Sequence, residues 1–424
     1  MQSLYNGAVM ESMLLRLDSS HPNPGQWPFA PSAPRLLLRC DGHSRITSLH
    51  NANDLVQTWD DPCEALDWME QHATNLPATS HARWIGYLSY DLGRLFENLP
   101  ATAADDLNSP LFEFGFCDRP HEMQRISPST GTPGEGREGV LSNDSPSQDY
   151  SSEPIARPQS NFTRETYCDA VQRVIDYIAA GDVFQVNLSQ RFTVECSDAP
   201  AAIYDRLTAQ TPAWYGALLD FGHHALVCNS PELFLKVDTN HRIITRPIKG
   251  TRPLGPGMEA LLRDSNKDQA ELNMIVDLER NDLGRVCEIG SVKVSEPRTI
   301  EAHPTVYHGA ATIEGKLRED VSFSDLLRAT FPGGSVTGAP KIRAMQIIEE
   351  LEPIRRGPYC GAIGYIAPGG QIEFNVAIRT MILKNARAYI SVGGGIVADS
   401  QADAEYEETL VKARAMFSAL GAAR

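Results

Sequence analysis

The hexapeptide Pro-Ile-Lys-Gly-Thr-Arg at 247–252 presents one lysine between a residue that fixes the backbone and a residue that frees it. Proline restricts φ to about −65°, whereas glycine adopts conformations that are closed to other residues. We therefore expect Lys249 at a rigid transition from a strand to a loop, where a reactive amine could be held in one position. The hexapeptide alone is also compatible with a solvated loop lysine, because most lysines are exposed.

Two carboxylates and a second lysine occur together near the C-terminus, where the segment at 400–421 has the periodicity of an amphipathic helix. Glu405, Glu408 and Lys412 form a stripe beside the apolar face of this helix. Carboxylates one turn apart could hold a hard cation such as Mg2+. The alternative is that the acidic residues complement the helix dipole and that Glu408 pairs with Lys412 at i,i+4.

An arginine and a run of glycines mark a third place for chemistry. The pattern at 359–397 predicts a β-meander, with Arg379 on the polar face of a strand. A turn at 385–386 would place Arg379 opposite Val392 and Gly393, beside the glycines 393–395. Glycines in a strand suit the close approach of a ligand, and arginine beside exposed amides forms a carboxylate receptor. A β-bulge with a surface arginine is the alternative.

Composition divides the chain into three parts. Residues 1–118 alternate short apolar runs with turn residues, which predicts an N-terminal α+β region. The stretch 119–160 is largely Ser, Pro, Gly, Asp and Glu; it cannot offset its ordering entropy by burial, so it predicts a mobile linker. Residues 161–424 form the larger domain, with Thr163 as the N-cap of its first helix and Ser324 as the N-cap of a later helix.

The net charge of −16 argues against general affinity for nucleic acid or for an anionic membrane, because both require clustered Lys and Arg. Eight scattered cysteines show no zinc-site spacing, which favours a reduced cytoplasmic protein. The N-terminus has no pattern of a secretory signal, and no apolar run approaches the roughly 18 residues of a membrane-spanning helix. An acidic protein that binds an anionic substrate needs a metal, backbone amides or an arginine.

Several ordered segments resemble the chorismate-utilising enzymes. The resemblance covers residues 162–420, with a weaker N-terminal match at 84–97. It implies an α+β fold in which large antiparallel sheets form a layered sandwich with helices outside. Its segments are Ser230-Pro-Glu232, 247–252, 271–285, 331–344, 361–365 and 393–413.

The resemblance also implies chorismate as substrate, Mg2+ as cofactor and a set of site residues. The implied metal ligands are Glu271 and Glu408, with Glu405 close by. Lys249, Glu232 and His308 take the catalytic positions. The implied chorismate-binding residues are Gly250, Thr251, Thr337, Tyr365, Arg379, Gly393, Gly394, Gly395 and Lys412.

Two positions indicate the branch of the family. Members that add water carry a lysine at the place of Gln185, and an amide cannot act as a base. Members that form anthranilate usually have alanine at the place of Lys249, whereas a lysine resembles the branch that makes 4-amino-4-deoxychorismate on the way to p-aminobenzoate and folate. In the implied mechanism Lys249 adds at C2, Glu232 protonates the departing C4 hydroxyl, and ammonia then attacks C4 and expels the lysine.

This mechanism requires a pKa of Lys249 below about 10.4 and a pKa of Glu232 above about 4.3, and burial shifts both in these directions. Ammonia should come from a separate glutamine amidotransferase subunit, because the chain lacks a Gly-x-Cys-x-Gly segment. Anthranilate formation is the alternative reaction. The alternative of another class is a catalytically silent subunit that only binds the glutaminase.

Overall fold

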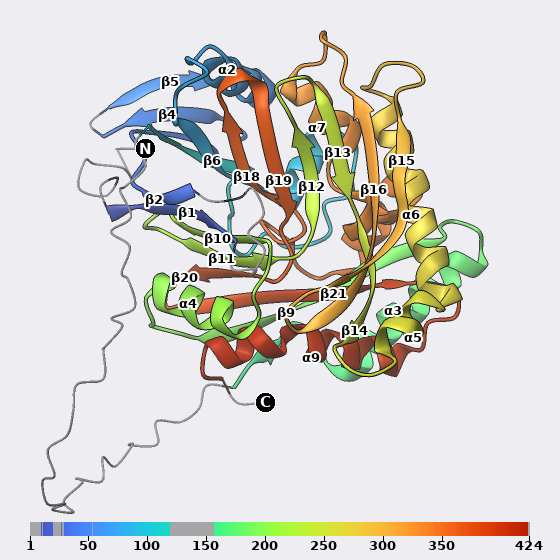
Figure 1. Cartoon of the computed structure of the whole chain (residues 1–424). Coiled ribbons are helices and arrows are strands. Elements are labelled where there is room, and N and C mark those ends of the chain that lie inside the picture. The colour runs from blue at the N-terminus through green and yellow to red at the C-terminus, as the bar shows by residue number, and fades with distance from the viewer. Residues whose placement is uncertain are drawn as a thin grey trace, which may run out of the picture.

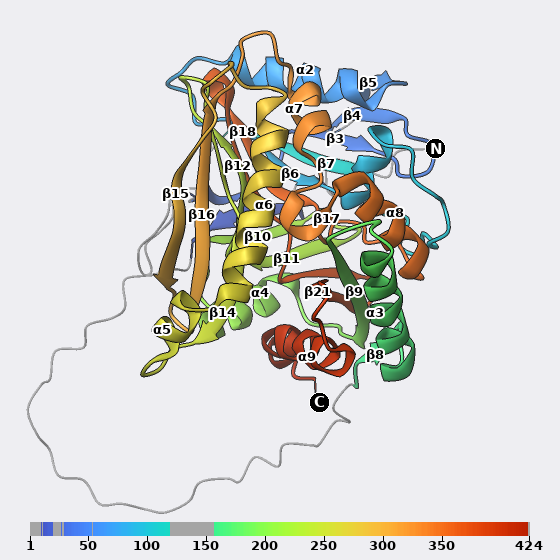
Figure 2. The ribbon, with the colours of Figure 1, turned by 90° about the vertical axis from the view of Figure 1, so that its right-hand side faces the viewer.

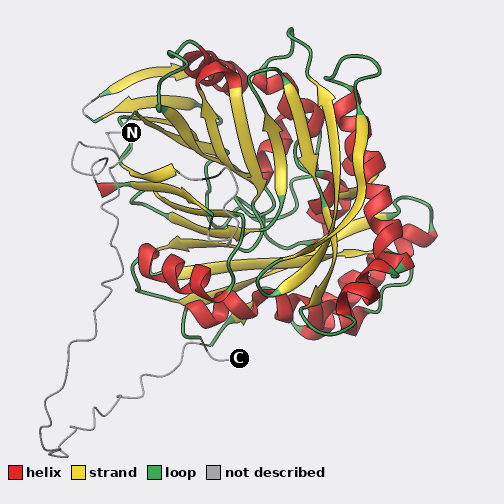
Figure 3. Cartoon of the chain, viewed as in Figure 1, coloured by secondary structure: helices red, strands yellow, loops and turns green. Residues whose placement is uncertain are grey.

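A computed structural model describes residues 10, 12–19, 27, 29–52, 54–118 and 157–422 of the chain. Of the predicted linker at 119–160, only residues 157–160 are described, so this prediction lies outside the described residues. Strands and helices together form a sandwich of two large antiparallel sheets with helices on the outer faces (Figures 1 and 3). The predicted α+β fold class is therefore confirmed.

The first sheet has nine strands in the order β17-β9-β21-β20-β11-β10-β1-β2, with β8 paired to β9. The bounds are β1 Leu14–Asp18, β2 Phe29–Ser32, β8 Gln159–Ser160, β9 Gln185–Glu195, β10 Tyr215–Asp220, β11 Ala225–Ser230, β17 Gly338–Ala339, β20 Thr380–Lys384 and β21 Arg387–Ile396. The longest pair is β9 with β21, whose register runs from Arg387 opposite Glu195 to Ile396 opposite Val186.

The second sheet has twelve strands in the order β14-β16-β13-β12-β19-β18-β6-β7-β3-β4-β5, with β15 paired to β16. The bounds are β3 Leu36–Cys40, β4 Thr47–Asn51, β5 Leu55–Trp59, β6 Arg83–Leu88, β7 Phe112–Cys117, β12 Leu233–Val237, β13 Arg242–Arg246, β14 Ile248–Pro253, β15 Lys293–Ala302, β16 Val306–Lys316, β18 Ala362–Ala367 and β19 Gln371–Val376. N-terminal strands thus share both sheets with strands of the larger predicted domain.

Helices cover the outer faces of the two sheets (Figures 1 and 2). Their bounds are α2 Pro62–Thr74, α3 Arg164–Ala179, α4 Pro200–Gln210, α5 Met258–Arg263, α6 Asn266–Gly284, α7 Phe323–Thr330, α8 Lys341–Leu351 and α9 Ala402–Ala419. None of those in the described ranges is long and apolar enough to cross a membrane.

Separate apolar layers hold the sandwich together. The inner layer packs residues of the nine-stranded sheet such as Leu17 and Leu226 against residues of the twelve-stranded sheet such as Ile85 and Ile363. The outer layers pack α4 and α9 on one sheet and α2, α6 and α7 on the other. Alternating strand residues therefore face two apolar layers, which explains why so many strands are buried along their whole length.

Two helix starts test the predicted caps. The side chain of Thr163 accepts from the backbone N–H of Thr166 and begins α3, so this cap is confirmed. Helix α7 begins two residues earlier than predicted, because Ser322 caps it through the backbone N–H of Asp325. Ser324, the predicted cap, instead lies in the first turn and donates its hydroxyl to Asp67 of α2 at 2.8 Å.

The predicted β-meander at 359–397 is wrong in one respect. Strand β19 pairs within the twelve-stranded sheet and β20 within the nine-stranded sheet, so the chain changes sheets between them. Arg379 lies in this crossover with a positive φ of 51°, not on the polar face of a continuous strand. The predicted turn at 385–386 is confirmed, since both residues have positive φ and Lys384 pairs with Arg387. The alternation across 372–382 came from two separate strands.

Candidate active site

Lys249 and Glu232 meet at the loop that carries Ser335. Lys249 lies on β14 at the edge of its sheet, and Glu232 lies in the short connection through which the chain passes from β11 to β12. The Lys249 Nζ donates to the carbonyl oxygen of Ser335 at 3.3 Å. The Glu232 carboxylate accepts from the backbone N–H of Ile248 at 3.4 Å, and the Ser335 side chain also hydrogen-bonds to it. One short loop therefore holds an amine and a carboxyl group together.

Burial sets the protonation states of this pair. It lowers the pKa of Lys249 and outweighs the nearby charges of Glu271 and Glu232, which favour the ammonium form. Burial also raises the pKa of Glu232, against a hydrogen bond from Ser335 and the charge of Lys249. The two shifts run in the directions that a lysine nucleophile and a glutamic acid proton donor require.

Gly250 and Thr251 continue the strand past Lys249. Gly250 has a φ of 82°, and a Cβ there would lie 2.7 Å from Leu262 Cδ1 and 2.9 Å from Asp268 Cγ. Only glycine fits this position, for both conformational and steric reasons. The strand therefore approaches α5 and α6 closely and holds Lys249 against them.

His308 lies opposite Thr251 in the register of β14 with β16. Its Nδ1 is 2.9 Å from the Thr251 hydroxyl. Burial, together with the charge of His303, lowers the pKa of His308 to about 3, so the ring is neutral at physiological pH. A neutral imidazole in this position can accept or donate one hydrogen bond, but it is not a cationic group for a carboxylate.

The three predicted metal ligands come from two helices. Glu271 lies on α6 beside β14, and Glu405 and Glu408 lie on α9 beside β21 (Figure 2). Burial raises the pKa of Glu271 and of Glu405; the charge of Glu405 adds to the first shift and that of Glu408 to the second, whereas Lys412 lowers the pKa of Glu408 against its burial. Glu408, whose side chain is 52% exposed, pairs with Lys412 at 2.7 Å. A set of oxygen ligands with unfavourable mutual charge suits a hard divalent cation.

The glycine run of β21 lies directly against these groups. A Cβ on Gly394 would lie 3.3 Å from Glu405 Oε2, 3.4 Å from Glu408 Oε1 and 3.7 Å from Lys412 Nζ. Lys412 also donates to the carbonyl oxygen of Gly393 at 2.8 Å. The strand and the carboxylates of α9 therefore enclose one narrow space, which a side chain on Gly394 would fill.

Gln185 lies beside the same glycine run, on β9. A Cβ on Gly395 would lie 2.9 Å from Gln185 Cδ. The Gln185 side chain is buried, and neither of its amide atoms has a hydrogen-bond partner within the described ranges. A buried amide without a partner in the protein is uncommon.

Arg379 occupies the crossover between the sheets, where a positive φ is uncommon for a residue with a side chain. Burial lowers the pKa of Arg379, against the influence of Tyr359 and Glu408. Arg379 has no ion-pair partner within 4.0 Å in the described part of the chain. Its guanidinium is therefore available to an anion bound at the crossover between the sheets. Tyr359, which the sequence prediction missed, is buried and lies near enough to Arg379 to influence its pKa.

Two predicted residues lie apart from this cluster. Tyr365 packs in the inner apolar layer against Trp27, and its hydroxyl donates to Glu373 at 2.9 Å. The tyrosine near Arg379 is Tyr359. Thr337 is buried and donates its hydroxyl to the carbonyl oxygen of Gly333 at 3.0 Å, so it supports the loop that carries Ser335.

A cavity of about 70 Å³ joins several of the predicted residues. Its lining includes Pro231, which precedes Glu232, together with His308, Arg379 and Lys412. A larger cavity of about 340 Å³ is lined by Arg94 and Arg355 and by none of the predicted residues. The smaller cavity has the convergent chemistry, because amine, imidazole and guanidinium groups meet around it.

The fold and the site define a class of enzyme. The family model for chorismate binding enzymes matches residues 29–418. The chain therefore belongs to the chorismate-binding enzyme family, and the family predicted from the motifs is confirmed.

Individual relatives belong to more than one branch of this family. The chain is 41% identical over 393 residues to aminodeoxychorismate synthase component 1 of Escherichia coli (strain K12), covering 88% of this chain and 86% of that protein. It is 41% identical over 371 residues to anthranilate synthase component 1 of Thermus thermophilus, covering 79% and 77%. The crystal structure of anthranilate synthase component I from Streptococcus pneumoniae TIGR4 is similar, with a TM-score of 0.73 and 30% identity over 95% of this chain and 92% of that chain.

Proposed function

We propose that this chain is the large subunit of an aminodeoxychorismate synthase, which converts chorismate and ammonia to 4-amino-4-deoxychorismate and water. The observation that carries the proposal is the juxtaposition of Lys249 and Glu232 at Ser335. Burial favours the neutral amine of Lys249 and the protonated carboxyl of Glu232. A nucleophile and a general acid are therefore prepared in one place.

The reaction proceeds in two substitutions. In the first, the Lys249 nitrogen forms a bond to C2 of chorismate, the ring double bonds shift, and the C4–O bond breaks as Glu232 donates its proton to the leaving hydroxyl. In the second, ammonia forms a bond to C4, the double bonds shift back, and the C2–N bond to Lys249 breaks. The new C4 ammonium gives one proton to the Glu232 carboxylate, so the neutral lysine and the glutamic acid are both regenerated, and one water molecule is released for each ammonia consumed.

Cationic and amide groups would bind the two carboxylates of chorismate. Arg379 offers a guanidinium fork beside Tyr359, and the amides of Gly393–Gly395 lie next to Lys412. The neutral ring of His308, held by Thr251, would contact a polar group of the substrate near the cavity. Because the glycines of β21 carry no side chains, they leave room for a flat ring beside α9.

Glu271, Glu405 and Glu408 would hold Mg2+, which when bound supplies positive charge to neutralise a substrate carboxylate. The Lys412 ammonium lies near Glu405 and Glu408 and partly offsets their charge. The glutamates thus also stabilise the ammonium form of Lys249, and burial has to outweigh them for the amine to be neutral.

Ammonia would come from a glutamine amidotransferase subunit. The Escherichia coli relative is itself named as component 1 of its synthase. The absence of a Gly-x-Cys-x-Gly segment in the sequence supports a separate source of ammonia. Ammonium salts at high concentration should replace this partner in an assay.

Anthranilate formation is the second candidate, because anthranilate synthase relatives are as similar in sequence as the aminodeoxychorismate synthase relatives. Lys249 argues against it, because in the proposed mechanism its amine, rather than ammonia, adds at C2. Gln185 argues against water addition, because an amide does not activate water.

The test is the product formed from chorismate, ammonium chloride and MgCl2 by the purified chain. The proposal predicts 4-amino-4-deoxychorismate, identified by mass spectrometry and by conversion to p-aminobenzoate after a lyase is added. Fluorescent anthranilate appearing without a lyase would establish the second candidate. Absence of any product at saturating ammonium would identify a silent binding subunit.

A further inference from the structure

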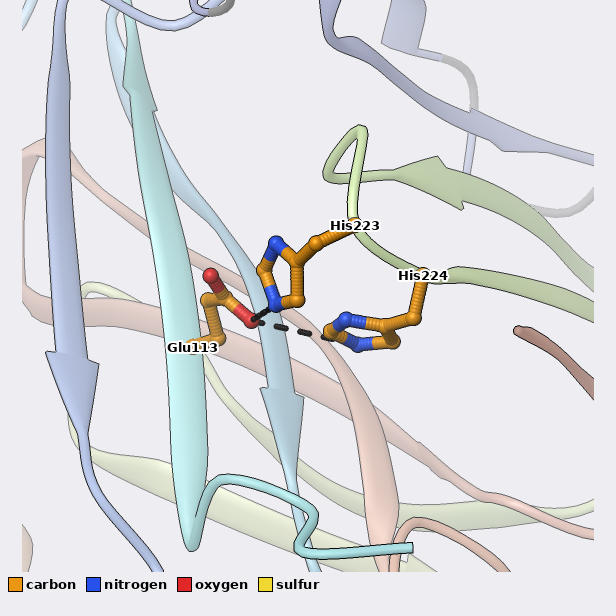
Figure 4. Close-up of side chains that lie close together, drawn as sticks. All are labelled: Glu113, His223 and His224. Carbon is orange, nitrogen blue, oxygen red and sulfur yellow. Dashed lines mark ion pairs between the residues drawn. The ribbon is translucent and has the colours of Figure 1, made fainter. Parts of the chain in front are cut away.

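Buried ionisable groups cluster in more than one place outside the candidate active site. Figure 4 shows the rings of His223 and His224, in the β10–β11 turn, beside the Glu113 carboxylate of β7. Their Nε2 atoms lie 3.6 and 3.8 Å from Glu113 Oε2, and this cluster links the two sheets. The buried ion pair of Glu352 and Arg356 differs from it, because this pair contacts the edge of β9.

The edge of β9 lacks a neighbouring strand along part of its length. Strand β21 pairs with β9 on one side from Val186 to Glu195. On the other side, β17 covers residues 185–186 and β8 covers residues 192–193. Within the described ranges, no strand lies against residues 187–191 on this edge. Because this part of β9 is buried, its backbone groups need other hydrogen-bond partners.

Glu352 and Arg356 supply such partners. Their side chains are 5% and 3% exposed, and the guanidinium donates two hydrogen bonds to the carboxylate. Glu352 Oε1 also accepts from the backbone N–H of Ser189 at 2.9 Å. Arg356 Nη2 donates to the carbonyl oxygen of Asn187 at 2.6 Å. The ion pair thus bonds to β9 through one acceptor and one donor, as a neighbouring strand would.

The same guanidinium holds the loop that carries Ser335. Arg356 Nη1 donates to the carbonyl oxygen of Val336 at 2.9 Å. The carbonyl oxygen of Thr337, the next residue, accepts from the backbone N–H of Asn187 at 2.9 Å. The loop and β9 are therefore tied together at adjacent residues, and one arginine side chain bonds to both of them.

Ser335 connects this loop to the reacting groups. Its carbonyl oxygen accepts from Lys249 Nζ at 3.3 Å, and its side chain hydrogen-bonds to Glu232. A shift of the loop relative to β9 would therefore move both contacts at once.

We propose that Arg356, held by Glu352, is a positioning residue of the active site. It fixes the loop at 333–337 against β9 and thereby places Lys249 and Glu232. This inference rests on the proposed function, in which these two residues are the nucleophile and the proton donor. Arg356 makes no hydrogen bond to either of them in the described part of the chain, so its effect passes through the loop.

Arg356→Lys is the test variant, because it keeps the charge but loses the planar fork that reaches two carbonyl oxygens and a carboxylate together. A displacement of about 1 Å at the reacting groups should lower kcat/KM for chorismate by about 100-fold. Because the hydrogen bond from Ser335 lowers the pKa of Glu232, loss of this bond should also move the fall of kcat/KM at high pH to a higher pH. A loss of global stability alone leaves this pH dependence in place.

Arg94→Lys is the matched control. Arg94 is largely buried and pairs with Glu349 of α8. Its other acceptors are Asp91 and the carbonyl oxygen of Pro100, and none of these groups belongs to β9 or to the loop that Arg356 holds. The control should lose stability to urea, as the test variant does, but should retain the wild-type kcat/KM and its pH dependence.

Hydrogen exchange of the free protein separates this inference from the proposed function. The backbone amides of 333–337 and 187–191 should exchange faster in Arg356→Lys than in the wild type, and at the wild-type rate in Arg94→Lys. Glu352→Gln, which keeps an oxygen for Ser189 but removes the charge, should show the same faster exchange. It provides a second test if Arg356→Lys does not fold.

The outcomes that contradict the two proposals differ. Unchanged exchange in Arg356→Lys and Glu352→Gln would overturn the role of Arg356. Faster exchange with wild-type kcat/KM and pH dependence, or the same kinetic changes in Arg94→Lys, would also overturn it. A chain that forms no 4-amino-4-deoxychorismate would refute the proposed function alone, and the exchange rates would still decide whether Arg356 holds the loop.

Discussion

Substitution of Gly250 by alanine should disable the enzyme by displacing Lys249. The left-handed φ of 82° costs a residue with a Cβ about 1–2 kcal/mol. The new Cβ would also lie 2.7 Å from Leu262 Cδ1 and 2.9 Å from Asp268 Cγ, and overpacking of this kind adds about 1–3 kcal/mol. We expect a total loss of about 2–5 kcal/mol in the free energy of unfolding, measured with urea.

Gly257 supplies the matched control. It has a similar φ of 76°, but a Cβ there meets no atom within 4 Å, so Gly257→Ala should lose only the conformational part, about 1–2 kcal/mol. A displacement of about 1 Å at Lys249 should lower kcat/KM for chorismate by about 100-fold in Gly250→Ala, with no change in Gly257→Ala. Equal stability and equal kcat/KM in the two variants would refute the view that close packing at Gly250 positions the lysine.

Three further predictions concern charge. The kcat/KM for chorismate should fall at low pH as Lys249 gains a proton and at high pH as Glu232 loses one. Glu232→Gln should remove the fall at high pH. An unchanged fall at high pH in this variant would assign it to another group. Burial raises the pKa of Glu279 from 4.5 to about 8, so the folded state binds this proton more tightly than the unfolded state does. As the pH rises from 4.5 to about 8, the free energy of unfolding should therefore fall by about 1.4 kcal/mol per pH unit. Urea unfolding of Glu279→Gln at pH 5 and pH 8 should show a smaller fall than wild type, and an equal fall would contradict the assignment. Glu271→Gln should raise the MgCl2 concentration for half-maximal activity by about tenfold or more, and an unaltered requirement would remove Glu271 from the metal ligands.

Local sequence patterns predicted much of the fold. The helix after Thr163, the C-terminal helix and the turn at 385–386 follow from capping, apolar period and turn chemistry, all of which act between near neighbours. The sheet order does not, because β6 lies between β18 and β7 through pairings that no local pattern specifies. The sequence did not predict the crossover at Arg379, because the alternation of apolar and polar residues continues from β19 to β20 although the two strands lie in different sheets.

The candidate site likewise contains residues that the sequence predicted and residues that it did not. Motif positions indicated Lys249, Glu232 and the carboxylates of α6 and α9, and the structure brings them around β14 and β21. Tyr359 and Ser335 were missed, although both lie within segments that carried the resemblance or the strand pattern. The proximity of Tyr359 to Arg379 depends on the change of sheet after β19, and a sequence pattern does not show that change.

Intact-mass spectrometry of the chain with chorismate and MgCl2, in the absence of ammonia, tests the central claim most directly. If Lys249 is the nucleophile, the wild-type chain should gain the mass of chorismate less one water, and proteolysis should locate the gain at Lys249. Lys249→Ala should show no gain and should lose the synthesis of 4-amino-4-deoxychorismate from ammonium. Full synthesis by Lys249→Ala, or an adduct at another residue, would contradict the covalent role of Lys249.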